Sequence, residues 1–212
     1  HYVTYCNDIY VTEPTRGRPR DPQTQRDIMS ATRRLLARDG YDQMSIESIA
    51  KEAGVSRPTI YRRWPSKAHL VFDAAFEQAP DGELLSNSGD FDNDLHAFIR
   101  AVLTFWREPV VEAATLGLLA ERRRDPELHI RTQQLLDERT RRAFRSLVDC
   151  GITQGAVRAD ADTDMLYQLL IGTAFYATQV EQYDDIDEFA KRLCSLVIQG
   201  AQHESKQQRG TR

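Results

Sequence analysis

The sequence predicts an all-α fold in two parts, a small N-terminal helical head and a larger C-terminal helical bundle. Apolar residues recur at helical spacing along most of the chain, with almost no alternation of the kind that marks strands. The segment PDGELLSNSGD at 80–90 is rich in Gly, Ser, Asn and Asp and indicates a boundary. We therefore expect a disordered leader or cloning remnant at 1–15, a head at 16–79 and a helical bundle at 80–212.

The segment TRGRPRD at 15–21 precedes the first expected helix and places Arg16 and Arg18 among Gly and Pro residues. Such a composition favours an extended chain. A basic arm of this kind can enter the minor groove of DNA, where arginine is attracted by the negative potential. The alternative is a charged leader with only non-specific affinity.

Within the head, a short helix is expected to begin after Ser45. In the short helix, Ile46 and Ile49 recur at helical spacing and form part of an inward stripe. Gly54 comes next, and glycine most easily adopts the left-handed conformation that ends a helix. The pattern predicts a sharp turn after this helix.

Another short helix is expected from Ser56 to Trp64, because Ser56 suits an N-cap and Pro65 prevents continuation. Ile60 and Trp64 face inward at about 100° per residue. The opposite side carries guanidinium, hydroxyl and phenol groups, which contact base edges and phosphates in a major groove. The two short helices therefore predict a helix-turn-helix that reads DNA, although a plain amphipathic helix pair is the alternative. The exposed residues are Arg57, Pro58, Thr59, Tyr61 and Arg62.

A connector helix is expected from Lys67 to Ala79, and the helices of the bundle follow the boundary segment. Their apolar residues recur three or four positions apart, and capping residues mark several of their ends. The expected helices of the bundle run over 91–107, 109–123, 126–151, 163–180 and 187–200.

The net charge of −4 conceals an uneven distribution along the chain. From Arg16 to Leu70 there are twelve Lys/Arg against six Asp/Glu, a surplus of six, so the rest of the chain carries −10. A basic head suits contact with phosphates, and charges beyond a Debye length of roughly 8 Å are screened. The distribution favours DNA as a partner of the head.

Several classes of protein are disfavoured by what the sequence lacks. No apolar run approaches the roughly 18 residues of a membrane span, and the N-terminus has no signal pattern. The three cysteines have neither disulfide nor metal spacing and fit a reducing compartment. No Ser/His/acid set, Cys/His pair or phosphate loop is present. We expect a cytoplasmic protein that is not an enzyme, uses no metal or cofactor and does not contact a membrane.

The run GVSRPTIYRRWPSKAHL at 54–70 resembles the pattern of the TetR family of bacterial transcriptional regulators. The stretch RDIMSATRRLLARDG at 26–40 resembles the first helix of that family. The likeness is close from Asp21 to about Glu77, and the remainder of the chain matches only in outline.

The resemblance implies that the exposed residues at 57–62 face the groove, with Tyr61 on a phosphate. It also implies that Ser45 and Lys67 hold the DNA backbone on either side, and helix N-termini such as theirs attract phosphate oxygens. Glu47 departs from some relatives, which carry a basic residue there. We do not expect Glu47 to contact DNA.

The resemblance also implies a homodimer, because the last two long helices of each subunit form a four-helix interface in the family. A two-fold dimer would set two reading helices about one DNA turn apart on a palindromic operator. The apolar stripes of these two helices also suit the core of one chain, and a helix can serve the core on one flank and the dimer interface on another. The residues expected at the interface are Met165, Leu169, Thr173, Phe189, Leu193, Leu196 and Val197.

Members of the family usually bind a small molecule inside the bundle, and this binding changes the separation of the heads. The resemblance therefore implies a small hydrophobic effector, although each candidate pocket residue also suits a plain core. The aromatic residues expected to line the pocket are Phe98, Phe105, Trp106, Phe144, Phe175 and Tyr176.

The sequence thus predicts a sequence-specific transcriptional regulator, a homodimeric repressor that an effector releases from double-stranded operator DNA. Two alternatives stay open, a DNA-binding architectural protein and an activator without a small-molecule effector.

Overall fold

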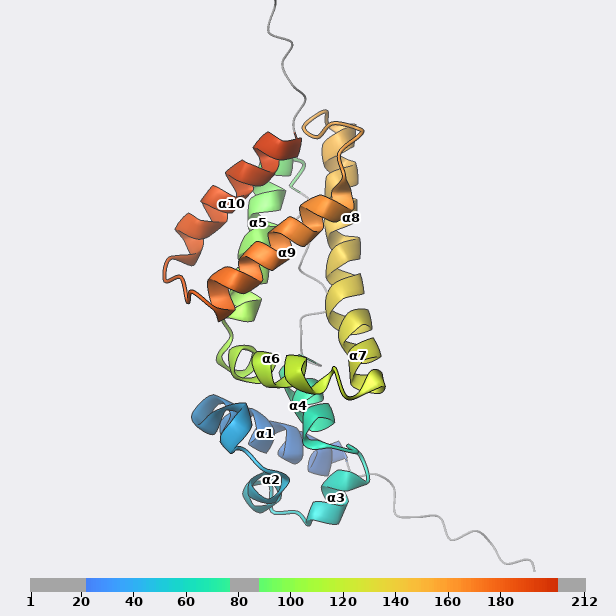
Figure 1. The fold of residues 1–212 in the computed structure, drawn as a ribbon, viewed down its shortest axis with the longest axis vertical. Coiled ribbons are helices and arrows are strands. Elements are labelled where there is room, and N and C mark those ends of the chain that lie inside the picture. The colour runs from blue at the N-terminus through green and yellow to red at the C-terminus, as the bar shows by residue number, and fades with distance from the viewer. Residues whose placement is uncertain (1–21, 77–87, 202–212) are drawn as a thin grey trace, which may run out of the picture.

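The computed structural model describes residues 22–76 and 88–201. The predicted all-α class is confirmed, because every regular element within these ranges is a helix. Figure 1 shows the head at one end of the molecule and the bundle at the other. The head contains α1 (Pro22–Gln43), α2 (Ile46–Glu52), α3 (Arg57–Tyr61) and α4 (Lys67–Phe76). The bundle contains α5 (Phe91–Trp106), α6 (Pro109–Glu121), α7 (Pro126–Thr132), the π-helix η1 (Gln133–Glu138), α8 (Arg139–Thr153), α9 (Thr163–Gln179) and α10 (Ile186–Ala201).

The long helix expected over 126–151 consists of α7, η1 and α8, which follow one another directly. Figure 1 shows them as one column along the side of the bundle. The π-helical turn in the middle of this column is not predicted by the sequence pattern. Such turns are rare and are frequently found at functional sites.

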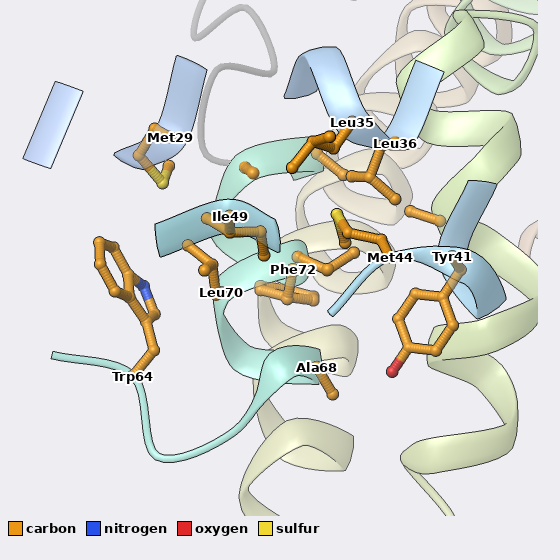
Figure 2. Close-up of a cluster of buried hydrophobic side chains, with 14 of the residues drawn as sticks. Met29, Leu35, Leu36, Tyr41, Met44, Ile49, Trp64, Ala68, Leu70 and Phe72 are labelled. Atoms are coloured by element: carbon orange, nitrogen blue, oxygen red, sulfur yellow. The ribbon is translucent and has the colours of Figure 1, made fainter. Parts of the chain in front are cut away.

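Buried apolar side chains form two separate cores. The first is formed by the four helices α1, α2, α3 and α4, together with one side of α6 and with Leu128 on α7. Figure 2 shows its centre, where Leu36, Met44, Leu70 and Phe72 lie close together between helices of the head. The second core joins α5, α8, α9 and α10. The expected boundary at residue 80 lies outside the described residues, but α6 follows that boundary in the chain and still shares the core of the head.

The close approach of α6 to the head requires a glycine at one position. A Cβ atom on Gly117 would lie 2.3 Å from Cδ1 of Tyr41, which is far inside van der Waals contact. Tyr41 itself is buried in the first core, and burial raises the pKa of its phenol to about 12. The ring of Tyr41 and the backbone of α6 therefore pack directly against each other.

Candidate DNA-binding surface and cavity

The start of α2 is fixed by a reciprocal pair of hydrogen bonds between Ser45 and Ser48. The Ser48 amide donates to Ser45 Oγ at 3.1 Å, and the Ser45 amide donates to Ser48 Oγ at 3.0 Å. This capping box satisfies two of the amides that a helix N-terminus leaves without partners. Ser45 is exposed at this end of the helix, as a phosphate contact requires.

The turn between α2 and α3 has the predicted geometry. Gly54 adopts a positive φ of 66°, and the Val55 amide donates to the carbonyl of Ala50 at 2.9 Å. Ser56 precedes α3, but its hydroxyl does not cap the helix as expected. Instead it lies 2.9 Å from Thr59 Oγ1, so the hydroxyl of Thr59 already has one partner.

The outer side of α3 carries the side chains that the sequence predicts to read DNA. Arg57, Pro58, Tyr61 and Arg62 are exposed, and Tyr61 retains 53% of its accessible surface. Ile60 is completely buried beneath them, which fixes the rotation of the short helix. Within the described ranges, the side-chain polar groups of Arg57, Tyr61 and Arg62 have no hydrogen-bond or ion-pair partner. They are therefore available to an external ligand.

Lys67 has an internal role that the sequence does not predict. Its ammonium group donates to the carbonyls of Tyr41 at 2.9 Å and of Met44 at 3.2 Å, and it lies 4.0 Å from the centre of the Tyr41 ring. An ammonium group has three N–H donors, so one remains for a phosphate. Lys67 thus fastens the start of α4 to the connection between α1 and α2.

Three more residues bear on the predicted DNA-binding surface: the expected contacts Arg16 and Arg18, and Glu47, which is not expected to contact DNA. Arg16 and Arg18 lie outside the described residues. Glu47 is exposed in the first turn of α2, where a carboxylate interacts favourably with the helix dipole. The local structure gives Glu47 a role at the helix N-terminus that needs no DNA contact.

Hydrogen bonds connect the end of the helix-turn-helix, the reading motif, to α4, and connect α4 to the bundle. Trp64 donates from Nε1 to Asp73 Oδ2 at 2.7 Å. The other carboxylate oxygen of Asp73 accepts a hydrogen bond from Arg131 on α7. The Arg131 guanidinium also lies 5.0 Å from the centre of the Phe72 ring. One carboxylate therefore connects the residue beyond α3 to the column of α7 and α8.

A second link joins α1 to the bundle. Arg33 donates to Glu108 Oε1 at 2.5 Å and to the carbonyl of Ala74 at 2.6 Å. Glu108 is the N-cap residue of α6. A single guanidinium thus holds α1, α4 and the start of α6 together.

A cavity of about 990 Å³ lies where α4 meets the bundle. Its wall is mostly apolar and aromatic, and residues from α4, α5, α6, α8 and α9 contribute to it. The volume lies in the range of small-molecule sites, and such sites combine apolar walls with a few polar groups. The main aromatic residues of the wall are Phe72, Phe76, Phe105, Trp106 and Phe175.

Three of the aromatic residues expected in the pocket wall, Phe105, Trp106 and Phe175, line the cavity. The other three do not line this cavity, and their role in an effector pocket stays a prediction. Phe98 and Phe144 are fully buried in the second core, where their rings pack at a tilt with centres 5.5 Å apart. Tyr176 points outward from α9 and is 53% exposed.

An exposed apolar stripe runs along α9. Its members lie three or four residues apart and therefore share one side of the helix. The exposed side chain of Leu196 on α10 adds to the apolar surface of this pair of helices. Contiguous exposed apolar surface of this kind commonly marks a contact with another protein. The exposed members are Met165, Leu169, Thr173 and Tyr176 on α9, with Val180 directly after the helix.

The expected interface residues on α10 divide between the surface and the core. Leu193 and Val197 are buried in the second core, which α10 shares with α5, α8 and α9. Phe189 is half-buried and packs against the same core with its ring centre 4.9 Å from that of Tyr183. Leu193 and Val197 thus serve the core of one chain, and their place in the expected dimer interface stays a prediction.

The residues that connect the head to the cavity are missed by the sequence reasoning. Phe72 and Phe76 lie four positions apart on α4, and the helix is buried on nearly all sides. A helix that is apolar all round is expected to contact neighbours on every face. That signal could have identified α4 as a wall of the cavity. The ion pairs of Asp73 and Glu108 join segments far apart in the chain, and no local pattern reveals them.

Neither a membrane span nor a metal site occurs in the described part of the chain. The helices there are too short or too polar to cross a bilayer. No group of three His, Cys, Asp or Glu side chains in residues 22–76 and 88–201 is arranged to hold a metal ion.

Two family models match the chain, one over each part. The model described as bacterial regulatory proteins, tetR family, matches residues 28–74. The model described as tetracyclin repressor-like, C-terminal domain, matches residues 85–197. The two matches together cover most of the described head and nearly all of the bundle.

Similar proteins cover almost the whole chain. The HTH-type transcriptional regulator YdeS of Bacillus subtilis is 29% identical over 189 residues, which are 88% of this chain and 94% of that protein. The regulator Rv1556 of Mycobacterium tuberculosis is 28% identical over 188 residues, covering 88% and 90% of the two chains. The crystal structure of the TetR family transcription regulator SCO0332 has a TM-score of 0.63 at 26% identity and covers 84% of this chain and 98% of its own.

Proposed function

Because the chain belongs to the TetR family of DNA-binding transcriptional regulators, we propose that it acts as a homodimeric repressor of a palindromic operator. In this proposal a small apolar molecule enters the cavity and releases the protein from DNA. The observation that carries the proposal is the location of the cavity, whose wall includes the helix that follows the reading motif.

The exposed side of α3 supports sequence-specific binding. Arg57 and Arg62 present guanidiniums that can pair with guanine edges or phosphates, and Tyr61 presents a hydroxyl between them. The buried Ile60 and the turn at Gly54 hold this side in a fixed orientation. A rigid mount of this kind favours reading of base edges over loose attachment to the DNA backbone.

The stripe on α9 supports the homodimer. It leaves large apolar side chains, including Leu169 at 56% exposure, in contact with water in the isolated chain. A second copy related by two-fold symmetry would cover this surface with the same surface of its own. Two reading helices would then be held at a fixed separation, which a palindromic operator requires.

The contacts of α4 support release by a molecule in the cavity. Phe72 and Phe76 line the cavity, whereas Asp73 between them holds both Trp64 and Arg131. A molecule that displaces these rings acts on the same helix that supports the end of the reading motif. Effector binding can therefore affect the orientation of α3 in two ways, through the backbone that joins α3 to α4 and through the carboxylate of Asp73.

Selection of bound duplexes from a random pool tests the proposal directly. We expect two inverted half-sites whose centres are separated by about one helical turn or a multiple of it. Equal retention of random duplexes would instead identify an architectural protein and contradict the repressor.

Variants on α3 provide the second arm of the test. We expect Arg57→Ala or Arg62→Ala to cost about 1–3 kcal/mol of binding free energy and to relax the preference at one base position. Arg142→Ala is the matched control, because Arg142 on α8 is exposed and has no partner among the described residues. Equal losses in the control and in the α3 variants would refute the assignment of the reading surface.

A further inference from the structure

Three consecutive arginines follow α6, and only the first of them lines the cavity. Arg122 is half-buried in the cavity wall, whereas Arg123 and Arg124 are exposed. Within the described part of the chain, the guanidinium of Arg122 has neither a hydrogen-bond nor an ion-pair partner. Leu118 and Leu119, which precede it on α6, are apolar members of the same wall. A cation therefore lies beside an apolar cavity without a counter-ion.

The two carboxylates in the cavity wall cannot neutralise Arg122, because each already has an arginine of its own. Glu108 accepts a hydrogen bond from Arg33 at 2.5 Å. Asp137 accepts one from Arg141 at 3.3 Å. Neither Arg33 nor Arg141 belongs to the wall, so both acidic groups are satisfied from outside the cavity.

Two further guanidiniums touch the cavity, and each has contacts within the protein. Arg100 pairs with Asp187, with Nε 2.6 Å from Oδ1, and is exposed. Arg139 also interacts with other residues. The positive charge of the wall that lacks a partner is therefore that of Arg122.

The wall thus favours a molecule with two chemically different ends. Aromatic rings and aliphatic side chains offer an apolar surface, which gains free energy when it covers a hydrophobic body. A guanidinium beside such a surface pairs strongly with a carboxylate, because its planar N–H groups match two oxygens at once. A neutral ligand would leave this cation without a counter-ion in a less hydrated site, which costs free energy.

From this arrangement we propose that the effector is an amphipathic anion, an apolar molecule with a carboxylate-like head that binds Arg122. The inference rests on the proposed function, because it names the chemical class of the molecule that enters the cavity. Phe72 and Phe76 would then contact the apolar body of the ligand, while its carboxylate group lies at the end of α6.

Calorimetric titration with ten-carbon probes tests this assignment on the full chain. Decanoate carries the anionic head, 1-decanol has the same body without charge, and decylammonium carries the opposite charge. We expect decanoate to bind at least tenfold more tightly than either of the others. Arg122→Gln should weaken decanoate about tenfold, which corresponds to about 1.4 kcal/mol, and leave 1-decanol unchanged. Arg123→Gln is the matched control and should bind all three probes like the parent protein.

Thermal unfolding of the same variants separates recognition from a structural role. If Arg122 served only to stabilise the end of α6, Arg122→Gln would lower the melting temperature and change the affinity for every probe equally. Equal affinity for decanoate and 1-decanol, unchanged decanoate binding in Arg122→Gln, or no binding of any probe would each overturn the inference.

Operator binding, measured on the same samples, distinguishes failure of the anion assignment from failure of the proposed function. Specific operator binding without anion selectivity would overturn the anion assignment alone. Selective decanoate binding that never weakens operator binding would support the anion site and contradict its role in release.

Discussion

The indole Nε1 of Trp64 donates a hydrogen bond to Asp73 Oδ2 at 2.7 Å. Trp64 is only 3% exposed and lies just beyond α3, whereas Asp73 lies on α4 between two aromatic residues of the cavity wall. This bond joins the support of the reading surface to the helix that faces the cavity.

Trp64→Phe removes this donor while keeping an aromatic ring in the core. We expect the free energy of unfolding to fall by about 1 kcal/mol, which is typical for loss of one buried hydrogen bond. Urea denaturation provides the measurement. Trp106→Phe is the matched control, because no hydrogen bond from the Trp106 indole is present among the described residues. The same urea midpoint in Trp64→Phe and the parent would show that the bond contributes no net stability.

Lys67→Met should destabilise the protein even when no DNA is present. The change removes two hydrogen bonds to the carbonyls of Tyr41 and Met44, and we expect a loss of about 1–2 kcal/mol. Lys51→Met on the exposed side of α2 is the control and should leave stability nearly unchanged. If both variants had the same stability and only DNA affinity fell in Lys67→Met, the internal role of Lys67 would be refuted.

Gly117→Ala should disturb the contact between the head and α6. The new methyl group would lie 2.3 Å from the Tyr41 ring, and forced overpacking of a core costs about 1–3 kcal/mol. Gly200→Ala is the control, because no atom lies within 4 Å of its added Cβ and alanine favours a helix. Differential scanning calorimetry should show a lower melting temperature for the first variant only; an increase in both would mean that the ring moves without cost.

Leu169→Glu should separate the proposed dimer into monomers. A carboxylate in the middle of the α9 stripe would be buried without a partner at the interface, which is strongly unfavourable. Leu116 on α6 provides a close match, because it is 58% exposed against 56% for Leu169 and lies away from the stripe. Light scattering should give the monomer mass for Leu169→Glu and the dimer mass for Leu116→Glu. If both variants remained dimeric, the interface would lie elsewhere on the protein.

Stability should decline at alkaline pH, in part through Tyr41. Burial raises the pKa of Tyr41 to about 12, whereas a tyrosine in the unfolded chain titrates near 10. Above pH 10 the unfolded chain loses this proton first, so the contribution is complete below about pH 10 and is lost as the pH rises toward 12.

Urea denaturation from about pH 9 to about pH 11 measures this decline, and Tyr41→Phe should make it shallower. Burial also raises the pKa of Cys194 to about 11 and that of Tyr167 above its usual range, so some decline remains in the variant. An identical decline in Tyr41→Phe and the parent would exclude a contribution from this phenol.

The head is the part of the fold that the sequence predicts in most detail. The caps and turn at Ser45 and Gly54 act between neighbouring residues, and the periodicity that buries Ile60 also exposes the side chains at 57–62. These features depend on local geometry, which the order of residues determines directly. The internal bonds of Lys67 span more than twenty residues and have no local signature.

The cavity could be predicted only in part, because helical periodicity shows which side chains face inward but not what they face. Phe98 and Phe105 both lie on inward positions of α5, yet Phe98 packs in the second core and Phe105 lines the cavity. Likewise, Leu193 and Leu196 lie on the same helix, and packing against the second core decides that Leu193 is buried while Leu196 stays exposed. Such distinctions depend on the packing of whole helices.

The division into two cores determines which parts of the protein can move as units. Because α6 and Leu128 share the core of the head, we expect residues 22–76 and 109–128 to move together as one block, and α5 with α8, α9 and α10 to move as another. Within the described residues, the chain passes between the blocks at the short joint from Arg107 to Glu108 and through the π-helical turn of η1. Among the described residues, rotation of the head would then bend the chain at these joints, and the reading surface would move together with α6, which forms part of the cavity wall.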